Sequence, residues 1–238
     1  MNHVTVELQS WLSAASIDGG VRALRPDYRA LLVLADDLEP GPSDAVSERM
    51  LAAAEERARE LFRQAPVLEH PHVLAWREAF RDFGAKPRRT RPSMEALLRR
   101  LDEGLPRINR LADAYNAISI AHVVPIGGED VSAYRGPLRL VRATGGETFD
   151  TVAGGEPALE NPEPGEVVWR DNDGVTCRRW NWRQCTRTRL TEQTTKAVFL
   201  LDALSPMTDT ALRAAANELM VDLRTLSPQA RFTTRLLP

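Results

Sequence analysis

The sequence predicts an α+β fold with helices packed on a mostly antiparallel β region. Three observations lead to this prediction. The first part of the chain reads as helices with one strand, a β-rich region begins at Pro137, and a strand and a helix follow it. Elements that are segregated in this way along the chain are typical of α+β domains.

The first 85 residues predict a helical part that contains one strand. Val6–Leu12 fits a short helix, and the mostly apolar run Tyr28–Ala35 fits a buried strand. Ser43 can cap a long amphipathic helix that ends before Pro66. A second amphipathic helix is expected around His70–Phe83, closed by Gly84.

The middle of the chain combines a basic loop with two further helices. Pro87 and Pro92 disfavour helix in the residues that precede them, so an extended loop is expected there. A helix is expected from Ser93 through Leu101. Another follows from about residue 108, breaks at Pro125, and leads into a turn at residues 127–128.

The β-rich region then predicts a strand at Leu138–Ala143 and a hairpin that turns at Asn172–Gly174. Lys196–Leu204 is a second, strongly buried strand. Met207–Leu226 is a clean amphipathic helix, and the last residues, 231–238, fit an edge strand.

Composition excludes several classes of protein. With 238 residues, 43% apolar and 27% charged, the chain suits one soluble domain. It has no apolar run of the roughly 18 residues that cross a bilayer, and its first residues lack the basic region of a secretory signal. Cys177 and Cys185 are the only cysteines and neither is part of a CxxC pair. We therefore expect a cytoplasmic protein with no membrane partner, disulfide, metal site or cofactor.

Positive charge is concentrated locally although the net charge is −2. Lys86, Arg88, Arg89 and Arg91 are expected on the exposed loop, where an RNA contact is plausible because a local field can bind phosphates. A solvated connector is an equally good interpretation, since arginine is also the default basic residue of GC-rich genomes.

Two polar patterns stand out beside apolar stretches. Asn109, Asp113 and Asn116 lie at i, i+4 and i+7, so on a helix they would share one face beside an apolar stripe. In an extended Arg178–Arg183, Trp180 and Trp182 would share one face, opposite Arg179, Asn181 and Arg183. Tryptophan beside arginine can hold an unstacked nucleotide, although two core tryptophans with solvent-facing arginines would give the same pattern.

Recognisable catalytic motifs are absent from the sequence. It contains no GxSxG, HExxH or P-loop. His122 has apolar neighbours and fits a structural role better than that of a general base. Cys177 and Cys185 are most simply packed residues in a reducing compartment.

Five short motifs occur in an order that resembles the free-standing B3/4 domain family, over roughly Phe80–Leu223. They are Asp113 with Asn116, Pro125 to Asp130, Gly146–Glu147, Pro164 to Glu166, and Arg178–Arg183. Members of this family are similar to the B3/B4 editing region of the phenylalanyl-tRNA synthetase β subunit. The resemblance implies a single B3/4-like domain over residues 1–238, with a core at 86–226 and a more variable part at 1–85.

The resemblance also implies a function. In the synthetase, this region hydrolyses the ester of a wrong amino acid on the 3′-terminal adenosine. An activated ester can be cleaved by an aligned water without a covalent nucleophile. The chain is therefore expected to be a trans-editing hydrolase, an aminoacyl-tRNA deacylase whose partner is mischarged tRNA. Glu147 and Glu166 are expected to hold turns rather than to react.

The implied site residues fall into three groups. The catalytic candidates are Asn116, Asn181 and Arg183. The candidates for substrate binding are Asn109, Asp113, Gly127, Gly128, Arg178, Trp180 and Trp182. The candidates for RNA binding are Lys86, Arg88, Arg89 and Arg91.

Other functions stay open on the sequence. Without a clear base or nucleophile, the chain could be a module that binds tRNA or an aminoacyl group without turnover, or a pocket for a free amino acid. The synthetase region commonly has a histidine in the turn after its proline, where this chain has glycine, so its amino-acid preference does not transfer. The sequence leaves the amino acid, the tRNA and the oligomeric state open, and an ATP-binding motif for synthetase activity is absent.

Overall fold

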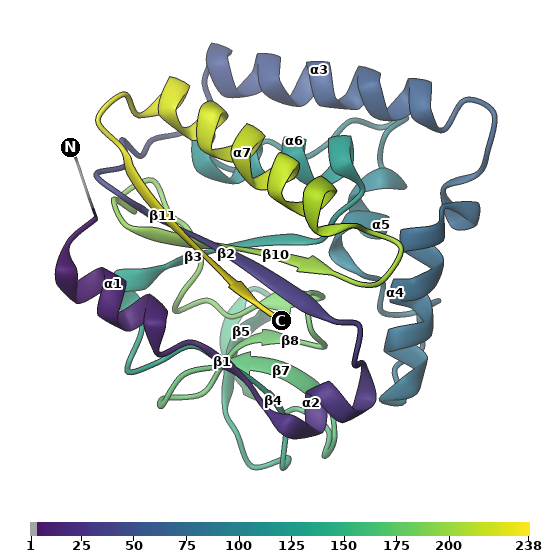
Figure 1. Cartoon of the computed structure of the whole chain (residues 1–238), viewed down its shortest axis with the longest axis vertical. Helices are drawn as coiled ribbons and strands as arrows, with labels where there is room; N and C mark the ends of the chain where they lie inside the picture. The colour runs from purple at the N-terminus through teal and green to yellow at the C-terminus, as the bar shows by residue number, and fades with distance from the viewer. Residues whose placement is uncertain (1–3) are drawn as a thin grey trace.

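The computed structural model describes residues 4–238 and confirms an α+β architecture. Figure 1 shows helices α3, α6 and α7 above a four-stranded sheet, with a second sheet below it. Two apolar cores result, one between the helices and the first sheet and one between the two sheets. Within the described residues, no helix is long and apolar enough to cross a membrane.

The central sheet is antiparallel throughout and has the order β11-β2-β10-β3. Its strands are β2 (Arg29–Asp36), β3 (Ile126–Asp130), β10 (Ala197–Ala203) and β11 (Arg231–Leu237). Both faces of β2 and β10 are covered, which explains why each reads as a continuous apolar run rather than an alternating one. The predicted buried strands and the predicted edge strand at the C-terminus are thus confirmed.

Three helices cover one face of this sheet: α3 (Ala45–Leu61), α6 (Arg110–His122) and α7 (Asp209–Leu226). Apolar side chains of α6 and α7 form one cluster with alternate residues of the strands, such as Leu31 and Val33 of β2. Helix α3 packs on α6, and its buried Leu51, Ala54 and Ala58 belong to the other cluster. The intervening residues of β2, Leu32 and Leu34, belong to the cluster on the other face. This alternation follows from the two-residue period of a strand.

The second sheet has the order β1-β4-β7-β8-β9, in which only the β1–β4 pair is parallel. Its strands are β1 (Ser16–Ile17), β4 (Arg139–Arg142), β7 (Val167–Arg170), β8 (Val175–Arg178) and β9 (Arg183–Gln184). A separate hairpin is formed by β5 (Phe149–Ala153) and β6 (Glu156–Glu160). The β7–β8 connection confirms the predicted hairpin.

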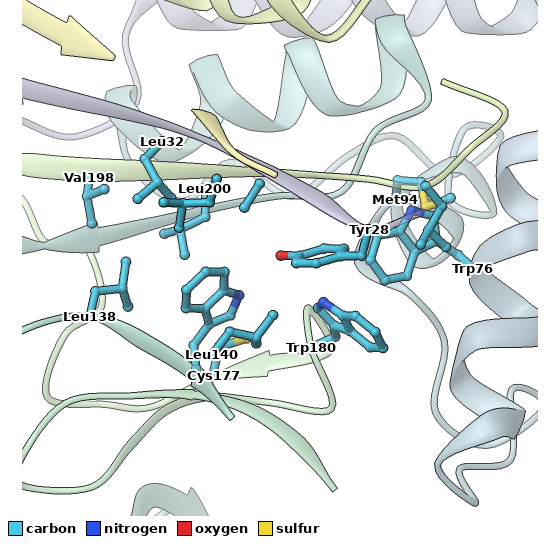
Figure 2. Packing of buried hydrophobic residues seen from close by; sticks show 14 of the residues in the cluster. Tyr28, Leu32, Trp76, Met94, Leu138, Leu140, Cys177, Trp180, Val198 and Leu200 are labelled. Atoms are coloured by element: carbon cyan, nitrogen blue, oxygen red, sulfur yellow. The ribbon is translucent and has the colours of Figure 1, made fainter. Parts of the chain in front are cut away.

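The remaining elements close the space between the sheets. They are α1 (Val6–Ser13), α2 (Gly19–Leu24), the 3₁₀ turns η1 (Val67–Glu69) and η2 (Val131–Ala133), α4 (Pro71–Asp82) and α5 (Ser93–Leu98). Figure 2 shows Trp76 of α4 beside Tyr28 and Trp180 at one end of this inter-sheet core. The ring centroids of Trp76 and Trp180 are 5.5 Å apart in an edge-on arrangement.

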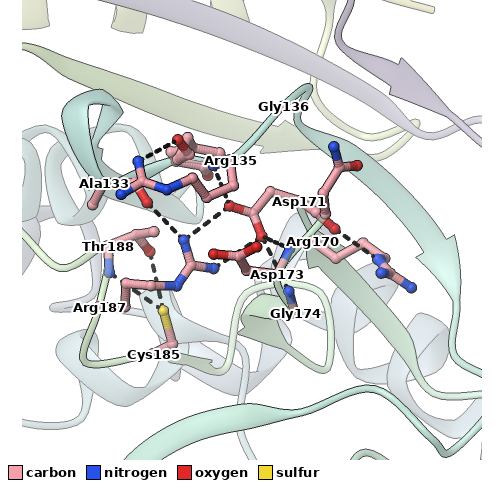
Figure 3. Close-up of polar contacts among 12 residues, drawn as sticks. Ala133, Arg135, Gly136, Arg170, Asp171, Asp173, Gly174, Cys185, Arg187 and Thr188 are labelled. Carbon is pink, nitrogen blue, oxygen red and sulfur yellow. Dashed lines mark hydrogen bonds and ion pairs between the residues drawn. The ribbon is translucent and has the colours of Figure 1, made fainter.

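A buried ion pair fixes the β7–β8 turn to the segment after β9. The carboxylate of Asp171 is fully buried and accepts hydrogen bonds from both terminal nitrogens of Arg187 at 2.9 Å. It also accepts hydrogen bonds from the backbone N–H groups of Arg135, Asp173 and Gly174 (Figure 3). Burial alone would raise the pKa of Asp171, but Arg187 and these N–H groups together lower it. The bidentate geometry fixes how the second sheet is folded.

Three local predictions are corrected. The long helix is capped by Asp44 rather than Ser43, and Asp44 accepts from the backbone of Val46 and Ser47. Helix α6 ends at His122, before Pro125, because Val123 adopts the left-handed conformation of a helix C-terminus. The helix predicted from about residue 108 begins at Arg110, so Ile108 precedes it and is 53% exposed.

Residues 127–128 do not form the predicted turn. They lie inside β3, where Gly127 pairs with Leu200 and Gly128 with Phe199 of β10. These glycines serve close packing instead. A Cβ on Gly128 would lie 2.7 Å from a methyl carbon of Leu190 and 2.9 Å from the ring of Tyr115.

The sequence predicted an extended Arg178–Arg183, but this segment turns sharply between β8 and β9. Arg179 and Trp180 have φ values of 48° and 67°, and Arg178 pairs directly with Arg183 across the hairpin. The N–H of Trp182 donates to the carbonyl of Arg178 at 3.1 Å. The strict alternation of side chains is lost, so Trp180 and Trp182 do not share a face.

Candidate functional site

A cavity of about 260 Å³ opens between the two sheets beside α5 and α6. Its walls come from five parts of the chain: α5 and the segment after it, the middle of α6, strand β3, strands β7 and β8 with the turn that follows, and the end of β10. The lining residues are Ser93, Ala96, Leu97, Arg100, Pro106, Ile108, Tyr115, Asn116, Ile126, Gly127, Glu129, Trp169, Cys177, Trp180, Asn181, Trp182, Arg183, Gln184, Leu200 and Asp202.

Six of the predicted site residues line this one cavity. Asn116 enters from α6 and Gly127 from β3, and the turn after β8 supplies Trp180, Asn181, Trp182 and Arg183. Asn116 and Asn181 are both buried, at 5% and 6% exposure, although each is polar. Helix α6, which carries Asn116, and the segment from Trp180 to Arg183 therefore meet at this cavity.

The turn after β8 is held by charges on both sides. The Arg178 guanidinium donates to both oxygens of Glu166 at 2.9 Å and to Glu160 at 2.7 Å. The guanidinium carbons of Arg179 and Arg183 lie 4.6 and 4.7 Å from the ring centroid of Trp182. The strained backbone thus has firm support, as is common where a turn aims side chains into a site.

Two carboxylates lie at the inner end of the cavity. Asp202, on β10, accepts from the Tyr28 hydroxyl at 2.6 Å and from the Asn181 amide nitrogen at 3.2 Å. Glu129, on β3, accepts from the hydroxyls of Tyr134 and Thr188. Both are at most 2% exposed, and in the described part of the chain neither has an ion-pair partner.

Burial determines how these carboxylates titrate. Loss of hydration raises the pKa of Asp202 to about 7, against the opposing hydrogen bonds from Tyr28 and Asn181. Burial also raises the pKa of Glu129. A buried carboxylate whose partners are all neutral is costly to ionise. Carboxylates with a raised pKa of this kind are typical of functional sites.

Four predicted residues support the site from outside the cavity. Asn109 caps α6 by accepting from the N–H of Ala112, and Asp113 accepts from the hydroxyl of Ser47 at 2.9 Å. Gly128 faces Tyr115 and the Arg178 guanidinium is bound to carboxylates. These four do not belong to the cavity lining.

The predicted basic loop lies next to the α5 wall of the cavity. Lys86, Arg88 and Arg89 are exposed, as expected, and surround a surface hollow. Arg91 is half-buried, and its Nε lies 3.9 Å from the buried carboxylate of Glu95. The first three side chains are therefore the ones available to a partner.

The sequence model for the B3/4 domain matches residues 75–226. The chain belongs to the B3/4 domain family. This match includes the α5, α6, β3, β8 and β10 parts of the cavity.

One solved structure is similar to most of this chain. It is an N-terminal fragment of the phenylalanyl-tRNA synthetase β subunit from Pyrococcus horikoshii, with a TM-score of 0.49 and 12% identity. The similarity covers 94% of this chain and 54% of that one, so the chain spans about half the length of the fragment. No curated protein matches the chain.

Several polar atoms at the cavity of this B3/4 domain lack a protein partner. They are the Asn181 side-chain oxygen and the indole nitrogens of Trp169 and Trp180, all in residues that are at least nine-tenths buried. Across residues 4–238 the Asn116 side chain also makes no hydrogen bond. Buried polar atoms without a partner are rare in proteins, and here they indicate that a ligand or ordered water completes the site.

The other predicted candidates play structural roles. His122 pairs with Glu218 at 2.6 Å on the helical side of the central sheet. Glu147 accepts from the N–H groups of Thr144 and Gly145 and holds that turn, as predicted. Among the described residues, no group of three or more His, Cys, Asp or Glu side chains could hold a metal ion.

Sequence reasoning missed Glu129 and Asp202. Asp202 occurs inside the apolar run of β10, where a charged residue on a fully buried strand is itself a signal. Glu129 was hidden because residues 127–130 were interpreted as a turn, where an acid is unremarkable.

Proposed function

We propose that this protein is a trans-editing hydrolase, which releases a wrong amino acid from mischarged tRNA by attack of water on the aminoacyl ester. The observation that carries the proposal is the convergence of Asn116 and Asn181 on one cavity within a B3/4 domain. Both amides are buried and retain hydrogen-bonding capacity. They can therefore position a water and an ester carbonyl.

The proposed mechanism needs no covalent intermediate: water adds to the ester carbonyl carbon, the bond from that carbon to the ribose oxygen breaks, and the leaving ribose oxygen takes up the proton that the water loses. An aminoacyl ester is already activated, so aligning the attacking water and stabilising the developing oxyanion can supply most of the rate. The N–H groups of the two amides and the Arg183 guanidinium are the candidate donors to that oxyanion. Gly127 leaves room for the substrate on the β3 side.

The basic loop supports tRNA as the partner. Lys86, Arg88 and Arg89 precede α5 in the chain, and α5 supplies Ser93, Ala96 and Leu97 to the cavity wall. A tRNA backbone on the loop could thus deliver its acyl end to the cavity. Because phosphate contacts release counterions, affinity should fall with salt, and the slope should decrease by about one for each contact removed.

Deacylation assays test the proposal. Purified protein is incubated with a panel of mischarged tRNAs, and free amino acid is measured. Asn116→Ala and Asn181→Ala should each reduce release at least about tenfold, as loss of a transition-state donor does. The matched control is Asn217→Ala on the exposed face of α7. No release from any member of the panel would refute the hydrolase.

A non-catalytic binding module is the second candidate, and one observation favours it. Cys177 is a potential nucleophile in the cavity lining, and burial raises its pKa well above the usual value, so its thiol stays protonated. A binding module would show salt-dependent tRNA affinity without release. Arg88→Ala with Arg89→Ala should weaken that affinity, whereas Arg213→Ala on α7 should leave it unchanged.

A further inference from the structure

The charges that line the cavity are arranged with polarity. Two arginines line the cavity. Arg100 is exposed and the Arg183 side chain is about one-third exposed, so both lie towards the opening. Its acids, Glu129 and Asp202, are almost completely buried at the inner end. A ligand that matches this field has negative charge outside and positive charge inside.

The inner corner at Asp202 presents acceptors that the protein leaves available. Each Asp202 oxygen receives one hydrogen bond, from Tyr28 or Asn181, and can accept another. The Asn181 side-chain oxygen next to it has no partner at all. The walls are aromatic, with Trp180 at the same corner.

This donor set discriminates between kinds of cation. An alkylammonium group donates up to three hydrogen bonds and gains from aromatic faces. A hard divalent metal ion requires several oxygen ligands, and among the described residues no cluster of three ligating side chains exists. The corner therefore suits an organic ammonium better than a metal ion.

We propose that the corner formed by Asp202, Asn181 and Trp180 binds an ammonium group of the ligand. This assignment rests on the proposed function and specifies its substrate class. The acyl group of the tRNA carries a free ammonium that enters the cavity first, while the tRNA phosphates stay near Arg100 and Arg183. Either the α-amino group or a side-chain amine could supply that ammonium.

Titration at the corner follows from the groups that face Asp202. These are Tyr28, which directly precedes β2, Cys177 from β8 and Glu129 from β3, and burial raises the pKa of each. Tyr28 and Cys177 stay neutral near pH 7. An ammonium binds the ionised form of Asp202, whose pKa is about 7 in the free protein. For a side-chain ammonium, which stays charged, affinity should therefore rise about tenfold from pH 6 to pH 8. An α-ammonium has a pKa of about 7.7–8.0 and is partly deprotonated at pH 8, so its affinity should rise only about three- to fivefold.

Fluorescence titration of the wild-type protein tests the inference, since three tryptophans line the cavity. The probes are phenylalaninamide, which has an α-ammonium, N-acetyl-lysinamide, which has only a side-chain ammonium, and N-acetylphenylalaninamide, which has neither. We expect one of the first two to bind at least about tenfold more tightly than the third, and which one binds identifies the source. Equal binding of the neutral probe, or no binding of either ammonium probe at its solubility limit, would overturn the inference.

Variants provide the second arm. Asp202→Asn should reduce the affinity for the preferred ammonium probe at least about tenfold and abolish the rise in affinity between pH 6 and pH 8. The matched control is Asp222→Asn on α7, which removes another acid with a raised pKa outside this cavity. Circular dichroism confirms folding, and an Asp202→Asn protein that binds like wild type would refute the assignment.

The two proposals fail separately. If mischarged tRNA is deacylated equally well when its aminoacyl group is N-acetylated and has no other amine, the ammonium site is wrong and the hydrolase stands. If ammonium probes bind as expected and no mischarged tRNA is cleaved, the hydrolase is wrong and the ammonium site stands.

Discussion

Asp202→Asn is expected to stabilise the protein at pH 8, although it removes a buried, hydrogen-bonded carboxylate. The substitution keeps the size of the side chain. Tyr28 can still donate to the new amide oxygen, as it does now at 2.6 Å. The amide of Asn181 can flip, because its oxygen has no partner, and then accept from the new NH₂ group.

The magnitude follows from the pKa of Asp202. In the folded protein it is raised from 3.8 to about 7. The unfolded chain therefore releases this proton first as the pH rises, so the free energy of unfolding falls between pH 3.8 and about 7 and is constant above. A difference of about three pH units corresponds to ~4 kcal/mol. Allowing for relaxation, we expect Asp202→Asn to gain about 2–4 kcal/mol at pH 8 and nothing at pH 3.5.

Urea unfolding followed by circular dichroism, at several pH values from 3.5 to 8, measures this gain. The wild-type and variant curves should diverge as the pH rises. The pKa of Asp222 is raised only to about 6, so the curves of Asp222→Asn and the wild type should diverge less. The reasoning is refuted if Asp202→Asn is destabilised at pH 8, or if its effect does not change with pH.

Three further predictions concern the frame of the site. Gly128→Ala should cost about 1–3 kcal/mol in urea unfolding, because the new methyl meets Leu190 and Tyr115; Gly19→Ala, where a Cβ meets nothing within 4 Å, is the control. Asp171→Ala should cost about 2–4 kcal/mol, since it leaves the half-buried Arg187 guanidinium without its carboxylate and the backbone N–H groups of Arg135, Asp173 and Gly174 without an acceptor, and an unchanged urea midpoint would contradict this. His72 has its pKa lowered to about 4 by burial, so the contribution of His72 to the free energy of unfolding should fall by up to ~3 kcal/mol as the pH drops from 6.5 to 4, opposite in sign to the contribution of Asp202 over this range. His72→Gln should reduce that slope in the same assay, and an unaltered slope would exclude His72 as its source.

Long, strongly patterned elements could be predicted from the sequence. Strands β2 and β10 are continuous apolar runs because both of their faces are covered, and α7 has one clean apolar stripe. Local backbone geometry could not be predicted where tertiary pairing decides it. Residues 127–128 have the composition of a turn, but pairing with β10 makes them a strand.

The candidate site could be predicted in part. Asn116, Asn181 and Trp182 were found through their unusual residue types and the family motifs, and the structure brings them to one cavity. The extended prediction for residues 178–183 was wrong because Arg179 and Trp180 adopt left-handed conformations, which residue types other than glycine do not indicate. Glu166, which contacts Arg178 and the N–H of Arg179, precedes them by more than ten residues. Tyr28 was invisible as a partner of Asp202, since 174 residues separate them.

The position of β2 has a consequence for how this protein can be divided. This strand lies before the family match at residues 75–226, yet it is hydrogen-bonded on one side to β10 and on the other to β11. A fragment trimmed to the matched residues would lose both β2 and β11, leave β10 as an open edge, and remove the phenol that donates to Asp202. The segments on either side of the matched region thus support the sheet that carries Asp202, and chains shortened to residues 75–226 should be insoluble.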